Sequence, residues 1–208
     1  FDYVYNDDNL FILDEPYKSL NADIGNIPKT FTQGLTSGGQ YYRPLLSISW
    51  IIDAQFAGDN ATDPAFYHFS NIMFHVIGSL LMFIALVKLR YDYMLSLLFG
   101  LLFVVHPILT PSACWISGRN DSILAIFVLL AFISLINYKD SASSYKWIWY
   151  LLNLLFFAAS VFTKEVGVFF IFVAAAYLYF RNKKKFFESE NIALAAGWII
   201  IAFIWYFM

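Results

Sequence analysis

The chain has 208 residues, of which 60% are hydrophobic, 21% aromatic and only 13% charged, and its mean hydropathy is +0.63. Soluble chains carry about a quarter charged residues, so this composition excludes a soluble globular domain. The net charge of -2 provides no basic surface for nucleic acid, and the single Cys114 excludes both a disulfide framework and a cysteine zinc cluster.

Residues 1–63 form a polar segment that holds nine of the fifteen acidic residues. Within it, residues 44–57 place apolar side chains at helical spacing, but this stretch is too short to span a bilayer. We therefore predict that residues 1–63 are an extramembrane loop containing an interfacial helix.

Six apolar stretches follow, each near or below the roughly 20 residues that a membrane-spanning helix needs. They cover residues 65–87, 93–116, 122–138, 147–163, 166–180 and 191–208. A soluble core able to surround six such stretches would require a much larger chain. The sequence therefore predicts an all-α polytopic membrane protein, in which residues 64–208 form a bundle of about six transmembrane helices.

Basic residues are distributed unevenly between the two ends of these stretches. Lysine and arginine in short loops are retained on the cytoplasmic side, so their distribution predicts the orientation. The end with more of them should be cytoplasmic, which places the loop of residues 1–63 outside. One end holds Lys88, Arg90, Lys139, Lys146, Arg181, Lys183, Lys184 and Lys185, and the other holds Arg119 and Lys164.

This topology brings charged and polar residues that are distant in sequence to the outer face. An ionisable group at a membrane edge costs roughly 2.5 to 3.5 kcal/mol on insertion scales unless it faces protein or water, so the cluster favours a functional site. Each residue taken singly is better explained as a helix-end side chain that reaches the interface. The cluster consists of Asp7, Asp8, Arg43, His106, Arg119, Asp121, Lys164 and Glu165.

Three polar residues, His68, Asn71 and His75, share one face of the first apolar stretch. Histidines separated by seven residues lie about 10 Å apart along a helix, too far to share one metal ion. We expect these side chains to form hydrogen bonds between helices.

The chemistry that the sequence offers is that of carboxylates and cations. It contains no HExxH, no GxSxG, no glycine-rich phosphate loop and no cysteine–histidine pair of a nucleophile and a base. Carboxylates opposite cations suit a reaction in which an acceptor hydroxyl loses a proton while the cations bind a phosphate leaving group. This favours an enzyme acting on a lipid phosphate; a membrane transporter, a flippase or a non-catalytic scaffold is the alternative.

Six motifs, in this order, resemble the transmembrane and tetratricopeptide-repeat-containing O-mannosyltransferases and their bacterial relatives, which belong to the GT-C glycosyltransferase superfamily. The motifs are Tyr3-Val4-Tyr5-Asn6-Asp7-Asp8, Tyr42-Arg43-Pro44-Leu45, Tyr67-His68 with Asn71 and His75, His106-Pro107, Trp115-Ile116-Ser117-Gly118-Arg119-Asn120-Asp121, and Lys164-Glu165. The resemblance implies an inverting enzyme that moves a hexose such as mannose from a polyprenyl- or dolichyl-phosphate donor to a hydroxyl on a protein or glycan.

The resemblance also implies roles for residues of the outer face. Asp8 or Asp7 would be the base, with Asp8 favoured, while Arg119 and Lys164, helped by Arg43, would contact the donor phosphate. It implies a spanning helix before residue 1, tetratricopeptide repeats after residue 208, and a location in the bacterial inner membrane or the endoplasmic reticulum membrane. Whether Mg²⁺ or Mn²⁺ binds the adjacent aspartates is left open. Supporting polar residues would be His106, Asp121, Glu165, His68 and His75.

Overall fold

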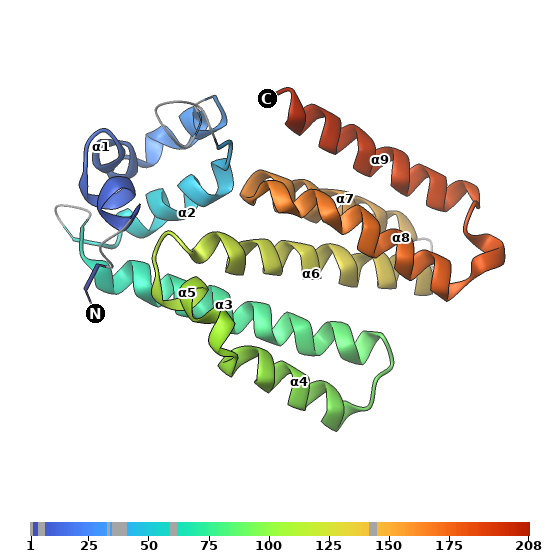
Figure 1. The fold of residues 1–208 in the computed structure, drawn as a ribbon. Coiled ribbons are helices and arrows are strands. Elements are labelled where there is room, and N and C mark those ends of the chain that lie inside the picture. Colours follow the sequence, from blue (N-terminus) through green and yellow to red (C-terminus); the bar gives the residue numbers. More distant parts are fainter. Residues whose placement is uncertain (1, 4–6, 33, 35–40, 59–61, 142–144) are drawn as a thin grey trace.

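A computed structural model describes residues 2–3, 7–32, 34, 41–58, 62–141 and 145–208. Within these ranges every regular element is a helix, which confirms the all-α prediction. Val4, Tyr5 and Asn6 of the first motif lie outside the described residues. Figure 1 shows a group of short helices, the head, at one end of a bundle of longer helices.

The head is built from four short helices. They are η1 (Asn9–Leu13), α1 (Tyr17–Ala22), η2 (Ile24–Phe31) and α2 (Pro44–Ala54). Proline at the first position of α2 suits a helix start, because its missing N–H would have no partner there. The helix predicted over residues 44–57 is thus present, but it ends at Ala54, and the turns that follow include Gly58 at a φ of 76°.

The head and the bundle share a hydrophobic core. Phe11 stacks on Trp50 with ring centroids 5.2 Å apart, and the bundle contributes the fully buried Tyr67 and Ile116. Fully burying one apolar side chain of this size stabilises the folded protein by roughly 1.5 to 3 kcal/mol. The head is therefore packed firmly onto the end of the bundle.

The bundle follows the six apolar stretches of the sequence. Its helices are α3 (Pro64–Lys88), α4 (Tyr93–Val105), η3 (Pro107–Leu109), α5 (Thr110–Cys114), α6 (Arg119–Asp140), α7 (Lys146–Thr163), η4 (Glu165–Phe169), α8 (Phe170–Arg181), η5 (Lys183–Lys185) and α9 (Ser189–Tyr206). Among the described residues, α3, α6, α7 and α9 are long and apolar enough to cross a membrane, and α4 with η3 and α5 forms a fifth candidate bent by 50°. The chain is a multi-pass membrane protein.

The number of candidate spans is lower than the six predicted, because the fifth apolar stretch does not form one long α-helix. Its first residues form the 3-10 helix η4, and α8 has only 12 residues. A Cβ atom on Gly167 would lie 2.7 Å from the backbone of Ser160 in α7, so η4 is pressed against the end of α7.

Polar side chains mark where several helices begin. Asp63 accepts a hydrogen bond from Ala65 N at the start of α3, and Asp92 accepts one from Leu95 N at the start of α4. His106 stands at the bend between α4 and η3, where its Nδ1 accepts from Ile108 N at 3.3 Å. Such caps satisfy backbone donors that have no partner inside the helix.

A polar contact also holds the interior of the bundle. Asn153 on α7 is fully buried; its Nδ2 donates to Ala131 O on α6 (2.8 Å), and its Oδ1 accepts from Trp198 Nε1 on α9 (2.8 Å). A side-chain amide that bonds two neighbours is typical of helix packing in membranes. Asn153 therefore fixes three helices relative to one another.

The two ends of the bundle allow a direct test of orientation. In full-length protein carrying Cys114→Ser, an impermeant thiol reagent added on the extracytoplasmic side should label Gly34→Cys and should not label Lys184→Cys until the membrane is permeabilised. The reason is that the basic residues of the short loops divide eight to two between the ends, not counting Lys18, Lys29 and Arg43 of the long loop. The reverse pattern would contradict the orientation.

Candidate active site

A pocket of about 300 Å³ lies where the head meets the bundle. Residues of the first, second and fifth sequence motifs line it, although they are far apart in the chain. The lining residues are Asp7, Leu10, Phe11, Tyr41, Arg43, Leu46, Trp50, Trp115, Ser117 and Asn120. The fold therefore gathers an acid, a cation, polar groups and aromatic walls in one place, at the end of the bundle predicted to face outward.

The two adjacent aspartates occupy different environments. Asp7 lines the pocket, whereas Asp8 is fully buried and does not. The Oδ1 atom of Asp8 accepts hydrogen bonds from Ser117 N (2.9 Å) and Ser117 Oγ (3.0 Å). Asp8 thus fastens the head to the loop before α6, and Asp7 is the acid that a ligand in the pocket can reach.

Arg43 is positioned by a bidentate ion pair with Glu165. Its Nε and Nη2 donate to the two oxygens of Glu165 at 3.0 and 2.7 Å, and its guanidinium lies 4.6 Å from the ring centroid of Tyr41. Paired, parallel hydrogen bonds of this kind fix orientation better than a single contact. Arg43 directly precedes α2 and Glu165 begins η4, so the ion pair joins the head to the bundle.

The pKa of Glu165 is shifted by this contact. Burial raises the pKa of its carboxyl, but the hydrogen bonds from Arg43, a backbone hydrogen bond and the charges of Arg43 and Lys164 together outweigh burial and leave the pKa below its ordinary value. The stabilisation of the folded protein by this ion pair is therefore complete above the ordinary glutamate pKa of about 4.3. It is lost as the pH falls through the lower pKa that Glu165 has in the folded protein. At neutral pH the ion pair is intact.

A second ion pair lies on the same outer end. Lys164 contacts Asp121, so the end of α7 is joined to the start of α6. Both side chains are partly exposed, and neither lines the pocket. Four of the eight residues of the predicted outer-face cluster thus form two ion pairs, which neighbour each other through Lys164 and Glu165.

Arg119 lies on the inner side of the first turn of α6 and is fully buried. It donates to Asp53 Oδ2 at 2.5 Å and to Tyr67 O at 2.8 Å. The predicted contact with a donor phosphate is not supported by this position, because Arg119 does not line the pocket and would have to leave Asp53. The next residue, Asn120, is the one that faces the pocket.

Asp53 is a residue that sequence reasoning missed. Burial raises the pKa of its carboxyl, while Arg119 and a hydrogen bond from Ser70 act in the opposite direction. A signal for it was present in the sequence, since Asp53 is the single charged residue of the apolar helix α2. Such a residue in a buried helix requires a partner of opposite charge.

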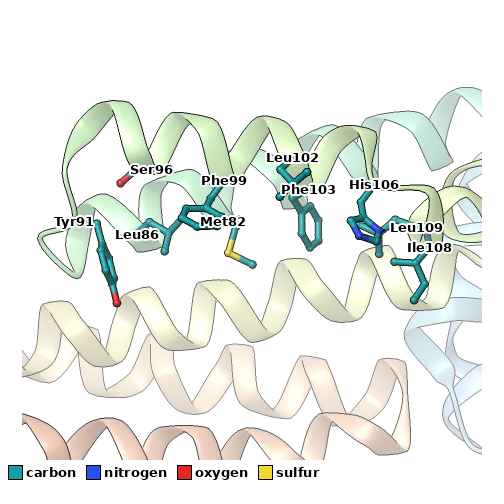
Figure 2. A pocket seen from close by; sticks show the side chains of 10 residues that line it. All are labelled: Met82, Leu86, Tyr91, Ser96, Phe99, Leu102, Phe103, His106, Ile108 and Leu109. Carbon is teal, nitrogen blue, oxygen red and sulfur yellow. Dashed lines mark hydrogen bonds between the residues drawn. The ribbon is translucent and has the colours of Figure 1, made fainter.

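The three histidines do not reach the pocket. His75 Nε2 lies 2.9 Å from Val104 O on α4, as expected for a bond between helices, and His68 Nε2 lies 3.1 Å from Asp2 O in the head. His106 lines a separate groove of about 560 Å³ along α3 and α4. Figure 2 shows His106 at one end of a row of mainly apolar side chains that includes Phe99.

Close backbone packing places the start of α6. A Cβ atom on Gly118 would lie 2.5 Å from Pro111 O in α5, a distance that real Cβ atoms essentially never show. Only glycine allows α5 and the first turn of α6 to approach this closely. The glycine therefore helps to set the positions of Ser117 and Asn120 in the pocket.

A metal site is not evident in the part of the chain that the structure describes. No three histidine, cysteine, aspartate or glutamate residues there are grouped so as to hold a metal ion. Whether a divalent cation takes part stays a prediction from the adjacent Asp7 and Asp8.

These features define an all-α multi-pass membrane protein with a pocket, lined by an aspartate and an arginine, between the head and the bundle. The family model of dolichyl-phosphate-mannose-protein mannosyltransferases matches residues 31–208. The chain belongs to that family, which confirms the relationship inferred from the motifs.

Curated relatives support the same assignment. The chain is 32% identical to Protein O-mannosyl-transferase TMTC2 of Homo sapiens over 173 residues, which are 77% of this chain and 20% of the relative. It is 30% identical to tmtc2 of Xenopus laevis (84% of this chain, 23% of the relative) and 30% identical to TMTC3 of Homo sapiens (65% and 14%). The chain thus spans less than a quarter of the length of these relatives. No solved structure matches the chain.

Proposed function

We propose that the full-length protein transfers mannose from a polyprenyl- or dolichyl-phosphate donor to a hydroxyl group, and that the pocket under the head is the reaction site. The observation that carries this proposal is that Asp7 and Arg43, a potential base and a potential phosphate ligand, line one pocket. The family assignment and the names of the relatives, protein O-mannosyl-transferases, support mannose as the sugar and protein as the acceptor.

Arg43 is the residue that we assign to the donor phosphate. Its Nη1 has no hydrogen-bond partner among the described residues, while Nε and Nη2 are held by Glu165. Asn120 lines the same pocket from the first turn of α6, where backbone N–H groups and the helix dipole favour an anion. Lys164, within its exposed ion pair, is a second candidate for the phosphate.

Asp7 is the residue that we assign to the acceptor. The acceptor oxygen attacks the anomeric carbon from the side opposite the phosphate, and its proton passes to the Asp7 carboxylate. The bond between the anomeric carbon and the phosphate oxygen breaks, and its electron pair leaves with the polyprenyl phosphate. The attack inverts the anomeric centre, and Arg43 stabilises the charge that develops on the leaving group.

The positions of the charged residues favour an enzyme over a transporter. Apart from histidines, every charged residue in α3, α4, α6, α7 and α9 lies in the first or last turn of its helix. Transporters place ionisable groups near the membrane midplane, where the coupling ion or substrate binds. Here the charges gather at the two ends instead.

A transfer assay with purified full-length protein tests the proposal. We expect Arg43→Lys to weaken binding of a polyprenyl-phosphate mannose by roughly 10- to 100-fold, because lysine cannot reproduce the planar fork and charged hydrogen bonds are worth about 1.5 to 3 kcal/mol. Lys18→Arg, an exchange of the same two residue types in the head but outside the pocket lining, is the control and should bind normally.

Two results would contradict the proposal. One is the absence of mannose transfer from any polyprenyl-phosphate mannose to a serine- or threonine-containing peptide by the folded wild type. The other is an unchanged donor affinity in Arg43→Lys, which would remove Arg43 from the donor site.

A further inference from the structure

A second polar pocket opens at the end of the bundle opposite the head. It has a volume of about 670 Å³ and lies among the ends of α3, α6 and α8, which Figure 1 shows next to one another. Three basic residues line it: Lys88 and Arg90 from the end of α3, and Arg181 from the end of α8. The orientation predicted from the basic loops places this pocket at the cytoplasmic leaflet.

The pocket keeps an excess of positive charge. Arg181 is neutralised by Asp140, whose Oδ1 accepts from Nη2 at 2.5 Å. Lys88 donates instead to the uncharged Asn137 Oδ1 at 2.9 Å. Lys88 and Arg90 therefore contribute two charges that the one lining acid, Asp140, does not balance.

Arg90 has a backbone conformation that seldom carries a side chain. Arg90 has a φ of 66°, and it follows the end of α3 in a turn closed by Arg90 N to Val87 O (2.9 Å) and Tyr91 N to Leu86 O (3.2 Å). Glycine is the usual residue at this position of the turn, because other residues are disfavoured at positive φ. An exposed arginine therefore lines the pocket at a position where the backbone conformation alone favours glycine.

The rest of the pocket is apolar. Phe132 of α6 and Phe180 of α8 line it, and Phe180 is 85% exposed in this structure. The cations suit a phosphate group, and the aromatic side chains suit acyl chains. The pocket therefore matches both parts of a molecule that carries a phosphate and acyl chains. Basic pockets between transmembrane helices on the cytoplasmic side are suited to anionic headgroups.

We propose that this pocket binds an anionic phospholipid, with the headgroup phosphate between Lys88 and Arg90 and the acyl chains along Phe132 and Phe180. The site is separate from the pocket under the head. It does not depend on the mannosyl transfer proposed above.

The test measures lipid retention by the full-length protein. Wild type is extracted from vesicles of equal parts phosphatidylglycerol and phosphatidylcholine, and the bound lipids are quantified by native mass spectrometry. We expect selective retention of phosphatidylglycerol, and a loss of roughly fivefold in Arg90→Gly, since one basic side chain near an anionic surface contributes about that factor. The backbone at residue 90 favours glycine, so a loss of folding does not explain this result.

Lys184→Gln is the matched control, because it removes one charge from the same end of the bundle but from a residue outside the pocket lining. It should retain phosphatidylglycerol as the wild type does. The proposal is overturned if Arg90→Gly and Lys88→Gln/Arg90→Gly both retain the lipid normally, or if Lys184→Gln loses it equally. Displacement of the lipid by an equal concentration of soluble glycerol 3-phosphate would also overturn it, since the acyl chains would then contribute nothing.

Discussion

Replacing Asp7 with asparagine is expected to lower the turnover of the full-length protein by roughly 10² to 10⁴, the typical contribution of general-base assistance. Asp7 is the one acid among the described residues that line the pocket under the head. Asparagine keeps the size of the side chain but cannot accept the acceptor's proton. Single-turnover rates and donor dissociation constants would check this, and we expect the rate to fall while donor affinity changes little.

Asp8→Asn is the matched control for this prediction. An asparagine oxygen can still accept the hydrogen bonds from Ser117 N and Oγ, so the loop before α6 should stay in place. We expect a lower unfolding temperature and a smaller loss of turnover than in Asp7→Asn. The opposite ranking would make Asp8 the base, as the sequence first favoured, and wild-type turnover in both variants would contradict catalysis by these carboxylates.

Replacing Asp53 with leucine is expected to lower the free energy of unfolding by about 3 to 5 kcal/mol. The change leaves the guanidinium of Arg119 buried without its partner carboxylate, and Arg119 has no exposed surface. Removing one partner of a buried pair is costly because the remaining charge loses its paired counter-charge and gains no water in exchange. Denaturation of the purified protein in detergent, and the yield of folded protein, would measure the loss.

Two further variants separate this role from a role in binding. Asp53→Leu/Arg119→Met removes both charges and should recover most of the stability, because an apolar pair can replace a buried ion pair. Asp121→Asn breaks the exposed contact with Lys164 and should cost at most about 1 kcal/mol. If Asp53→Leu were stable and only donor affinity fell in Arg119→Lys, Arg119 would be the phosphate ligand that the motif first indicated.

The helices of the bundle could be predicted because they depend on local apolar runs, and the clustering of Arg43, Asp121, Lys164 and Glu165 followed from topology alone. The direction of Arg119 could not be predicted. The helix α6 is apolar around much of its circumference, so periodicity does not distinguish the side that faces Asp53 from the side that faces the pocket. That choice depends on a partner that lies 66 residues away.

The different positions of Asp7 and Asp8 could not be predicted from the sequence either. Adjacent residues in a helical turn point in different directions, and here Asp7 lines the pocket while Asp8 does not. Which one does so is decided by Ser117, 109 residues further along the chain. The length of α8 could not be predicted either, because the close packing of Gly167 in η4 against Ser160 does not appear as a change in hydrophobicity.

The pocket under the head has walls from two parts of the chain that are distant in sequence. Asp7 and Arg43 come from the head, whereas Trp115 and Asn120 come from the loop and helix after the bent span. A nascent chain whose later spans are not yet inserted therefore has no pocket. The site is complete only when the head packs against the finished bundle through the Asp8–Ser117 and Asp53–Arg119 contacts, so this packing must precede the binding of any substrate.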